Sequence, residues 1–248
     1  MSKNGNMRNG KADKPAQNSQ SQERETKFMT TSSKPIDPLY KPEDVQHIDY
    51  QRDLGDPGDH GRFLDLWPVG KMPVLRDAAR DRVVPETPII IEYLDRHYPG
   101  AAPLLPADPE TRLDVRLWDR FFDLHVQDPM QRIVADRLRP EPRRDPEGVR
   151  EQEARLRTAY GMIERQTAHG DWAVGAAFSM ADCAAAPALF YAGILVPFPE
   201  DHPHLAAYFE RLLARPSFRR VLAEARPWFD YFPFNDRMPD RFRTIEPA

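Results

Sequence analysis

The sequence predicts an α+β fold of two domains, a small domain of strands and helices followed by a larger domain made only of helices. Three observations predict it. Residues 1–33 are polar and nearly free of large apolar side chains, residues 70–98 show a strand, turn, strand and helix pattern, and helical periodicity begins after the proline-rich stretch 101–109. We therefore expect a disordered tail over 1–33, a first domain over 34–100 and an all-helical domain over 109–234.

Composition excludes several classes of protein. The chain has 248 residues, 40% of them hydrophobic, with a net charge of -4, so a basic nucleic-acid-binding surface is not expected. The single cysteine, Cys183, cannot form an intrachain disulfide and fits a reducing compartment. The most apolar stretch, 181–198, carries Asp182 and Pro187, which favours a buried helix over a membrane span. We expect a cytoplasmic protein with no nucleic-acid or membrane partner.

Within the first domain, apolar and polar residues alternate imperfectly over 45–52, which predicts a strand. Residues 56–66 predict a short helix. Residues 74–75 follow a proline that cannot donate to a ladder, which suits the first residues of a short strand. A polar turn then leads to a second strand at 83–84. A helix should begin at residues 86–87 and run to about residue 98, because the proline after its start is tolerated in a first turn.

The second domain shows helical spacing almost throughout. Its first helix should run from about residue 109 to 139, bent or interrupted at Pro129. The side chains expected to form a packing stripe on this helix are Leu113, Leu117, Trp118, Phe121, Phe122 and Leu124. Further helices are expected over 147–167, from Ser179 with Asp182 as its capping partner, over 204–215 and over 217–225. The aromatic segment 228–234 should pack back on the body.

The residues around Pro73 and Glu86 suggest a binding site for a small acidic peptide. The backbone beside Pro73 can pair with an extended ligand as an added strand would. Free amides at the helix start by Thr87 attract a carboxylate, and the Glu86 carboxylate can take an ammonium group. Glutathione combines an extended backbone, an α-carboxylate and an α-amine. Two structural strands and a capped helix would account for the same residues.

The chain resembles the cytosolic glutathione S-transferase family, as a bacterial-type member, from about residue 45 to 234. The motifs that carry the resemblance are Met72-Pro73, Glu86-Thr87, Glu92-Tyr93-Leu94 and Tyr98-Pro99. The resemblance implies a thioredoxin-like first domain, an all-helical second domain, glutathione as co-substrate, an apolar electrophile, a role in detoxification and a homodimer. It also implies a cis peptide bond before Pro73 and assigns glutathione binding to Lys71, Met72, Pro73, Glu86 and Thr87, the last replacing the commoner serine.

The resemblance implies a catalytic serine, tyrosine or cysteine after the first strand, at a helix start that lowers the pKa of the glutathione thiol. This unit should fall within 29–41, where scattered prolines fit no strand followed by a helix. We therefore expect the usual first strand–helix unit to be missing or replaced. The remaining hydroxyl candidates for catalysis are Ser32, Ser33 and Tyr40. The histidines show no metal-ligand spacing, and we predict no metal site.

Two functions stay open. In the first, the chain conjugates the glutathione thiol to apolar electrophiles. In the second, it is a non-catalytic relative that keeps the fold as a binding or scaffold protein. A thioredoxin-like redox protein is disfavoured, because the sequence has no Cys-x-x-Cys motif. His125 could contact substrate from the long helix, although an exposed helix histidine is the simpler interpretation.

Overall fold

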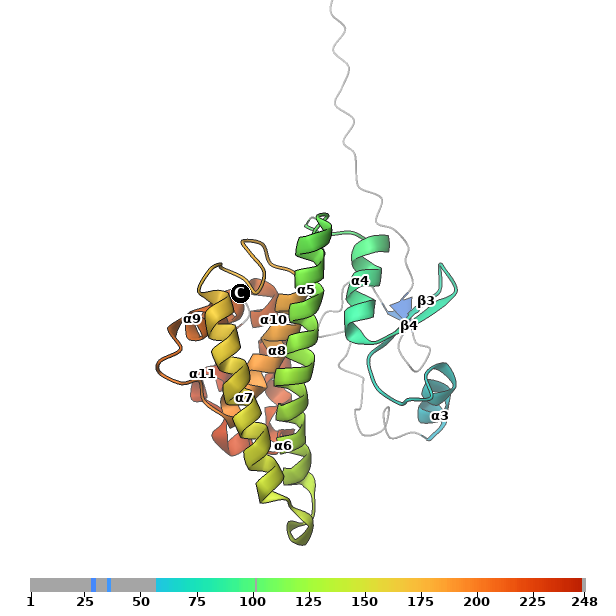
Figure 1. Cartoon of the computed structure of the whole chain (residues 1–248). Coiled ribbons are helices and arrows are strands. Elements are labelled where there is room, and N and C mark those ends of the chain that lie inside the picture. The colour runs from blue at the N-terminus through green and yellow to red at the C-terminus, as the bar shows by residue number, and fades with distance from the viewer. Residues whose placement is uncertain (1–27, 30–34, 37–56, 101, 247–248) are drawn as a thin grey trace, which may run out of the picture.

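The computed structural model describes residues 28–29, 35–36, 57–100 and 102–246 of the chain. A small part built on strands lies beside a larger group of helices, and α4 lies between the strands and that group (Figure 1). The elements of the small part are β1 (Phe28–Met29), β2 (Pro35–Ile36), α3 (Pro57–Leu66), β3 (Val74–Asp77), β4 (Arg82–Pro85) and α4 (Thr87–His97).

The strands form one antiparallel sheet in the order β2-β1-β3-β4. The hairpin of β3 and β4 pairs Val74 with Pro85 and Asp77 with Arg82, on either side of the predicted polar turn. Both predicted strands of this hairpin are therefore confirmed. The strand predicted over 45–52 lies outside the described residues.

The position of β1 corrects the predicted disordered tail over 1–33 at two residues. Phe28–Met29 pairs with β3, so that Phe28 lies opposite Asp77. An open strand edge presents unpaired amides and carbonyls to any extended segment, and two adjacent apolar residues suit that role better than their polar surroundings. The predicted tail is therefore wrong at these two residues.

The connection between β1 and β2 bears on the missing strand–helix unit. Only residues 30–34 separate these strands, which run antiparallel. A parallel pair joined through a helix needs a connection of roughly a dozen residues or more. No crossover helix can therefore stand between β1 and β2, which agrees with the expectation that the usual first strand–helix unit is replaced.

The larger part is helical, as predicted. Its elements are α5 (Pro109–Phe121), η1 (Phe122–Gln127), α6 (Asp128–Leu138), η2 (Glu141–Arg143), α7 (Pro146–Thr167), α8 (Met180–Leu195), α9 (Pro203–Ala214), α10 (Pro216–Ala225), η3 (Arg226–Tyr231), η4 (Asn235–Arg237) and α11 (Asp240–Arg243). Five of the α-helices begin at a proline. Proline suits a first turn because the amides there have no helical partner.

A single long helix is formed by α5, η1 and α6 (Figure 1). The predicted break at Pro129 is replaced by the π-helical segment η1, which ends just before it. A wider turn with bonds from residue i to i+5 relieves the clash between a proline ring and the carbonyl one turn earlier. The chain therefore stays helical past Pro129.

Helix α8 is the centre of the core. It contacts α4, α5, η1, α6 and α9, and Ala185, Leu189 and Ala192 on it are fully buried. Alanines allow the surrounding helices to approach closely. The apolar stretch around 181–198 is thus the predicted buried helix, and no helix in the described part of the chain has the length and apolar character needed to cross a membrane.

Asp182 ties the start of α8 to its surroundings. One carboxylate oxygen accepts hydrogen bonds from the Ser179 amide at 2.8 Å and the Ser179 hydroxyl at 3.1 Å. The other oxygen accepts from the Ala173 amide at 2.8 Å and the Tyr208 hydroxyl at 2.7 Å. The predicted capping partner is confirmed, and it also joins a loop and α9 to α8.

Candidate functional site

The backbone around Met72 and Pro73 is exposed at the end of β3. The Met72–Pro73 peptide bond is cis, as predicted. The Gly70 amide donates to the Trp67 carbonyl at 2.9 Å, and the φ of 70° at Gly70 lies in the region that favours glycine. Lys71, Met72 and Pro73 are all exposed, Met72 by 57%. An extended peptide can therefore reach this backbone and pair with it.

Helix α4 begins with an open, polar end. Glu86 precedes it with a φ of 69°, a strained value for a residue with a side chain, and makes no capping hydrogen bond. The Ile90 amide donates to the Glu86 carbonyl at 2.9 Å, which leaves the Thr87 and Ile89 amides without helical partners. Glu86 and Thr87 are exposed. A carboxylate can bind these amides while Glu86 takes an ammonium group.

A buried carboxylate fixes this helix against the sheet. Asp77, only 1% exposed, accepts hydrogen bonds from the Tyr93 and Tyr98 hydroxyls, each at 2.6 Å. Burial alone would raise the pKa of Asp77, but these hydrogen bonds and two from turn amides lower it. Burial and the hydrogen bond to Asp77 raise the pKa of Tyr93 to about 12. Asp77 thus holds β3 and α4 in register, which places Glu86 beside Pro73.

A cleft of about 310 Å³ separates the start of α4 from the long helix. Met72 and Thr87 line one side. The opposite wall carries four oxygen-bearing side chains at four-residue steps, here called the polar ridge: Asp119, Asp123, Gln127 and Gln131. In an α-helix a four-residue row drifts around the axis, and the wider turn of η1 counteracts that drift. The π-helix therefore keeps the ridge facing the cleft.

The two acids of the ridge are electrostatically unusual. Asp119 is 2% exposed, and burial, with Asp123 nearby, raises its pKa to about 7 despite Arg120. Burial also raises the pKa of Asp123; Arg120, 3.4 Å away, opposes this and Glu86 adds to it. Because the charge of Glu86 contributes to the raised pKa of Asp123, the helix start and the ridge belong to one electrostatic site. Perturbed acids in a cleft are characteristic of functional sites.

A second cavity, here called the aromatic groove, has a volume of about 510 Å³. It lies between α6, α8 and the segment from Ala225 to Pro233, and Gln127 and Gln131 line it as well as the cleft. Its ring-bearing residues are Tyr191, Trp228, Phe229, Tyr231 and Phe232. The segment expected to pack on the body does so through Phe229, while Tyr231 stays 72% exposed.

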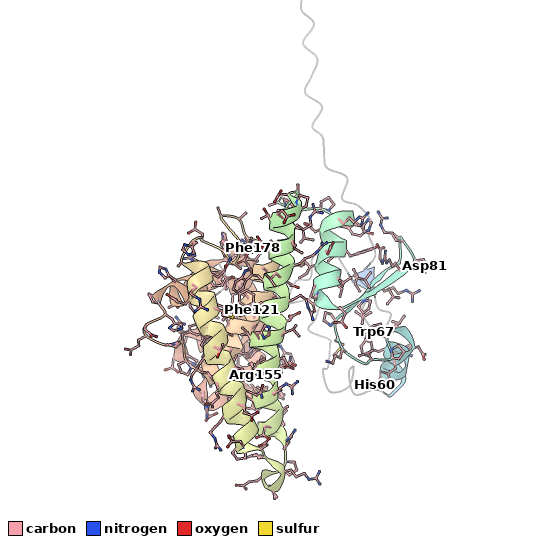
Figure 2. All side chains as sticks on the ribbon, viewed as in Figure 1. His60, Trp67, Asp81, Phe121, Arg155 and Phe178 are labelled. Atoms are coloured by element: carbon pink, nitrogen blue, oxygen red, sulfur yellow. The ribbon has the colours of Figure 1, made fainter. Side chains whose placement is uncertain are left out.

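Other predicted residues have structural roles or lie elsewhere. Phe121 and Phe122 are buried core residues, as the packing interpretation predicts. His125 is exposed, with its ring centroid 5.1 Å from that of Phe121, and it lines neither cavity. His60 lies on α3, away from the helical part (Figure 2). Ser32, Ser33 and Tyr40 lie outside the described residues.

Cys183 also lines the cleft, next to the ridge. Burial, reinforced by Asp182, raises the pKa of its thiol to about 12. The thiol therefore stays protonated at neutral pH and is a poor nucleophile. In the part of the chain that is described, no three histidine, cysteine or acidic side chains gather closely enough to hold a metal ion.

The ridge and the groove are what the sequence reasoning missed. In the sequence, the ridge is indicated only by oxygen-bearing residues at four-residue steps, at positions 119, 123, 127 and 131. The apolar residues of the same helix form a more prominent pattern, which hides this signal. That apolar spacing was also misleading: Leu113 and Leu117 are each 61% exposed, whereas Val115 faces the core. The long helix has two apolar faces, and the described part of the chain covers only one of them.

Known proteins share this arrangement. Two family models match, the glutathione S-transferase N-terminal domain over residues 44–102 and the C-terminal domain over residues 121–216. A glutathione S-transferase-like protein of Fusarium sp is 31% identical over 162 residues, which is 64% of this chain and 73% of that protein.

Solved structures show the same likeness. A glutathione S-transferase of Methylobacillus flagellatus with glutathione bound is 27% identical, with a TM-score of 0.60 over 67% of this chain and 82% of that one. One from Methylobacterium radiotolerans, in complex with glutathione sulfonate, is 33% identical, with a TM-score of 0.52 over 61% of this chain and 71% of that one. With a thioredoxin-like first domain, incomplete in the residues that the structure describes, and an all-helical second domain, the chain belongs to the glutathione S-transferase family.

Proposed function

We propose that this protein binds glutathione in the cleft between α4 and the long helix and transfers it to a second, electrophilic substrate. One observation carries the proposal: the exposed backbone at the cis bond of Met72–Pro73 lies beside the open helix start at Glu86 and Thr87. Two similar structures were solved with glutathione or a derivative, which supports the same ligand here. A cytoplasmic role in detoxification follows from this activity.

Each end of glutathione has a partner in this scheme. Its peptide backbone pairs with the chain at Met72, and Lys71 lies beside its acidic groups. Its γ-glutamyl carboxylate binds the amides and hydroxyl at Thr87, and its ammonium group lies at Glu86. The aromatic groove lies next to the cleft and takes the apolar part of the second substrate.

Replacing Glu86 with alanine tests this assignment. The change leaves the ligand's ammonium group unpaired, and glutathione binding measured by calorimetry should weaken by roughly 1.5–3 kcal/mol. Glu110→Ala, which removes an exposed acid from the first turn of α5, is the matched control and should bind as the unaltered chain does. Equal binding by Glu86→Ala and Glu110→Ala would contradict the assignment.

A non-catalytic relative is the second candidate, favoured by the direct antiparallel connection of β1 to β2. The usual thiol-activating residue stands at a helix start after the first strand, and no helix fits between these strands. A thiol-conjugation assay run beside the calorimetry separates the two functions. Glutathione binding that depends on Glu86 without turnover supports a binding protein, whereas turnover lost on changing Ser32, Ser33 or Tyr40 supports the enzyme.

The proposed active form is a homodimer. Leu113, Leu117 and Leu124 form an outward apolar face on α5 and η1, each at least half exposed, and Ile89 on α4 is 52% exposed. A second copy can cover this face with the same residues about a two-fold axis. Leu117→Glu should give a monomer by light scattering, because a buried, unpaired charge opposes assembly. Met162→Glu, on the exposed side of α7, should leave the dimer intact, and a monomeric unaltered chain would refute the proposal.

A further inference from the structure

The aromatic groove is suited to a flat, uncharged molecular body. None of its lining residues carries a charge, and its volume of about 510 Å³ is typical of small-molecule sites. Trp228 and Tyr231 lie with ring centroids 6.0 Å apart, and Tyr191 and Phe232 5.0 Å apart. Such surfaces stack well against an aromatic ring.

The groove shares two lining residues with the cleft that contains the polar ridge. Gln127 and Gln131 line both the groove and the cleft, so a molecule seated in the groove has one end at the polar ridge. From Gln127 the ridge continues to Asp123, one four-residue step or about 6 Å away, and then to Asp119. A short side arm on a ring spans the first of these steps.

Two side chains of the ridge have acceptor oxygens without a donor among the described residues. Asp119 is 2% exposed, and no donor among the described residues bonds to its carboxyl group. The amide oxygen of Gln127 is buried and also lacks a hydrogen-bond partner in the described structure. Unpaired buried acceptors are costly, and rotation of the Gln127 side chain can turn its oxygen to a donor in the cavity. The ridge therefore favours a ligand group that donates hydrogen bonds and carries positive charge.

We propose that the second substrate is an arylalkylamine that also carries an electrophilic carbon, with its ring in the aromatic groove and its alkylammonium group on the ridge at Gln127, Asp123 and Asp119. This inference rests on the proposed function for the reaction, and it names the class of molecule that receives glutathione. The accepting carbon is the end of a carbon–carbon double bond conjugated to a carbonyl group: the thiol sulfur bonds to that carbon, the π bond breaks, and the thiol proton goes to the neighbouring carbon, so that no group leaves. Glutathione brings one ammonium group of its own, which Glu86 takes at the other end of the cleft. Asp119 and the Oδ1 oxygen of Asp123, whose Oδ2 oxygen accepts from Arg120 at 3.4 Å, remain for the second substrate.

Three probes with one ring system test the charge preference. These are 2-(2-naphthyl)ethylamine, 2-(2-naphthyl)ethanol and 2-naphthylacetate, titrated by calorimetry at pH 8 with and without saturating glutathione. At that pH most of Asp119 is ionised, since its pKa is about 7. The amine should bind at least about tenfold more tightly than the alcohol, because a hydrogen bond between charged groups replaces a neutral one, and the acetate should bind most weakly.

Variants assign the preference to the ridge. In the double variant Asp119→Asn with Asp123→Asn, the amine should lose its advantage over the alcohol, while the alcohol binds as before. Trp228→Leu should weaken all three probes by a similar factor, since it removes a ring surface that the three naphthyl groups would share. Asp114→Asn, an exposed acid on the same helix, should change nothing.

Failure of the inference differs from failure of the proposed function. Equal binding of amine and alcohol by the unaltered chain overturns the inference, as does an amine preference that survives the double variant. Absence of glutathione binding overturns the proposed function, while an amine preference measured without glutathione still supports the site. No binding of any probe, with glutathione bound, overturns the inference alone.

Discussion

Asp182→Ala should be the most destabilising single substitution considered for this protein. The carboxylate is fully buried and accepts four hydrogen bonds, so its loss leaves four donors unpaired in the core. Each buried, unsatisfied group costs about 1–3 kcal/mol. We expect a loss of at least about 4 kcal/mol, a large part of the stability of an ordinary domain.

Urea unfolding followed by circular dichroism measures this loss. Asp114→Ala, an exposed acid on α5, should shift the free energy of unfolding by no more than about 0.5 kcal/mol. Tyr208→Phe removes one of the four donors and should give a smaller loss of about 1 kcal/mol. An Asp182→Ala midpoint equal to that of Asp114→Ala would show that the four hydrogen bonds contribute nothing net.

Asp119→Asn should have the opposite effect on stability. Burial, with Asp123 nearby, raises the pKa of Asp119 from 3.8 to about 7, so the folded chain keeps a proton that the unfolded chain releases between these values. The folded state therefore binds more protons in this window, and stability falls as pH rises from about 4 to 7. The full shift is worth about 4 kcal/mol above pH 7.

Unfolding free energies measured from pH 4 to 8 test this expectation. Asp119→Asn keeps the shape of the side chain without its charge, so its stability at pH 8 should exceed that of the unaltered chain by several kcal/mol, with a flatter pH profile. Asp114→Asn should follow the unaltered chain. Parallel profiles for Asp119→Asn and the unaltered chain would show that the carboxyl group is solvated. A buried charge kept at such a cost is consistent with a ligand site.

Local signals predicted much of the fold. Prolines and capping residues gave the helix starts, and the short apolar pair before Arg76 gave the first hairpin strand. Two features depend on contacts between distant segments, which periodicity does not report. Asp119 is buried because α8 packs on α5, and Leu117 is exposed because the core occupies the opposite face.

The candidate site divides in the same way. The candidate glutathione-binding residues form two pairs of neighbours in the sequence, Met72-Pro73 and Glu86-Thr87. The sequence alone therefore indicates this part of the candidate site. The second-substrate side joins residues around 127–134 to residues 225–233. These residues can be recognised as one site only from the structure, which packs residues 225–233 against α6.

The π-helix η1 divides the long helix into two stretches that line different cavities. The α5 stretch carries Asp119 toward the cleft, and the α6 stretch carries Met130 and Val134 toward the aromatic groove. Because the wider turn separates two regular hydrogen-bond ladders, substitutions beyond Gln127 do not alter the ladder that positions Asp119. The part of the site that lines the aromatic groove can therefore diverge among descendants of this chain while Asp119 keeps its position in the cleft.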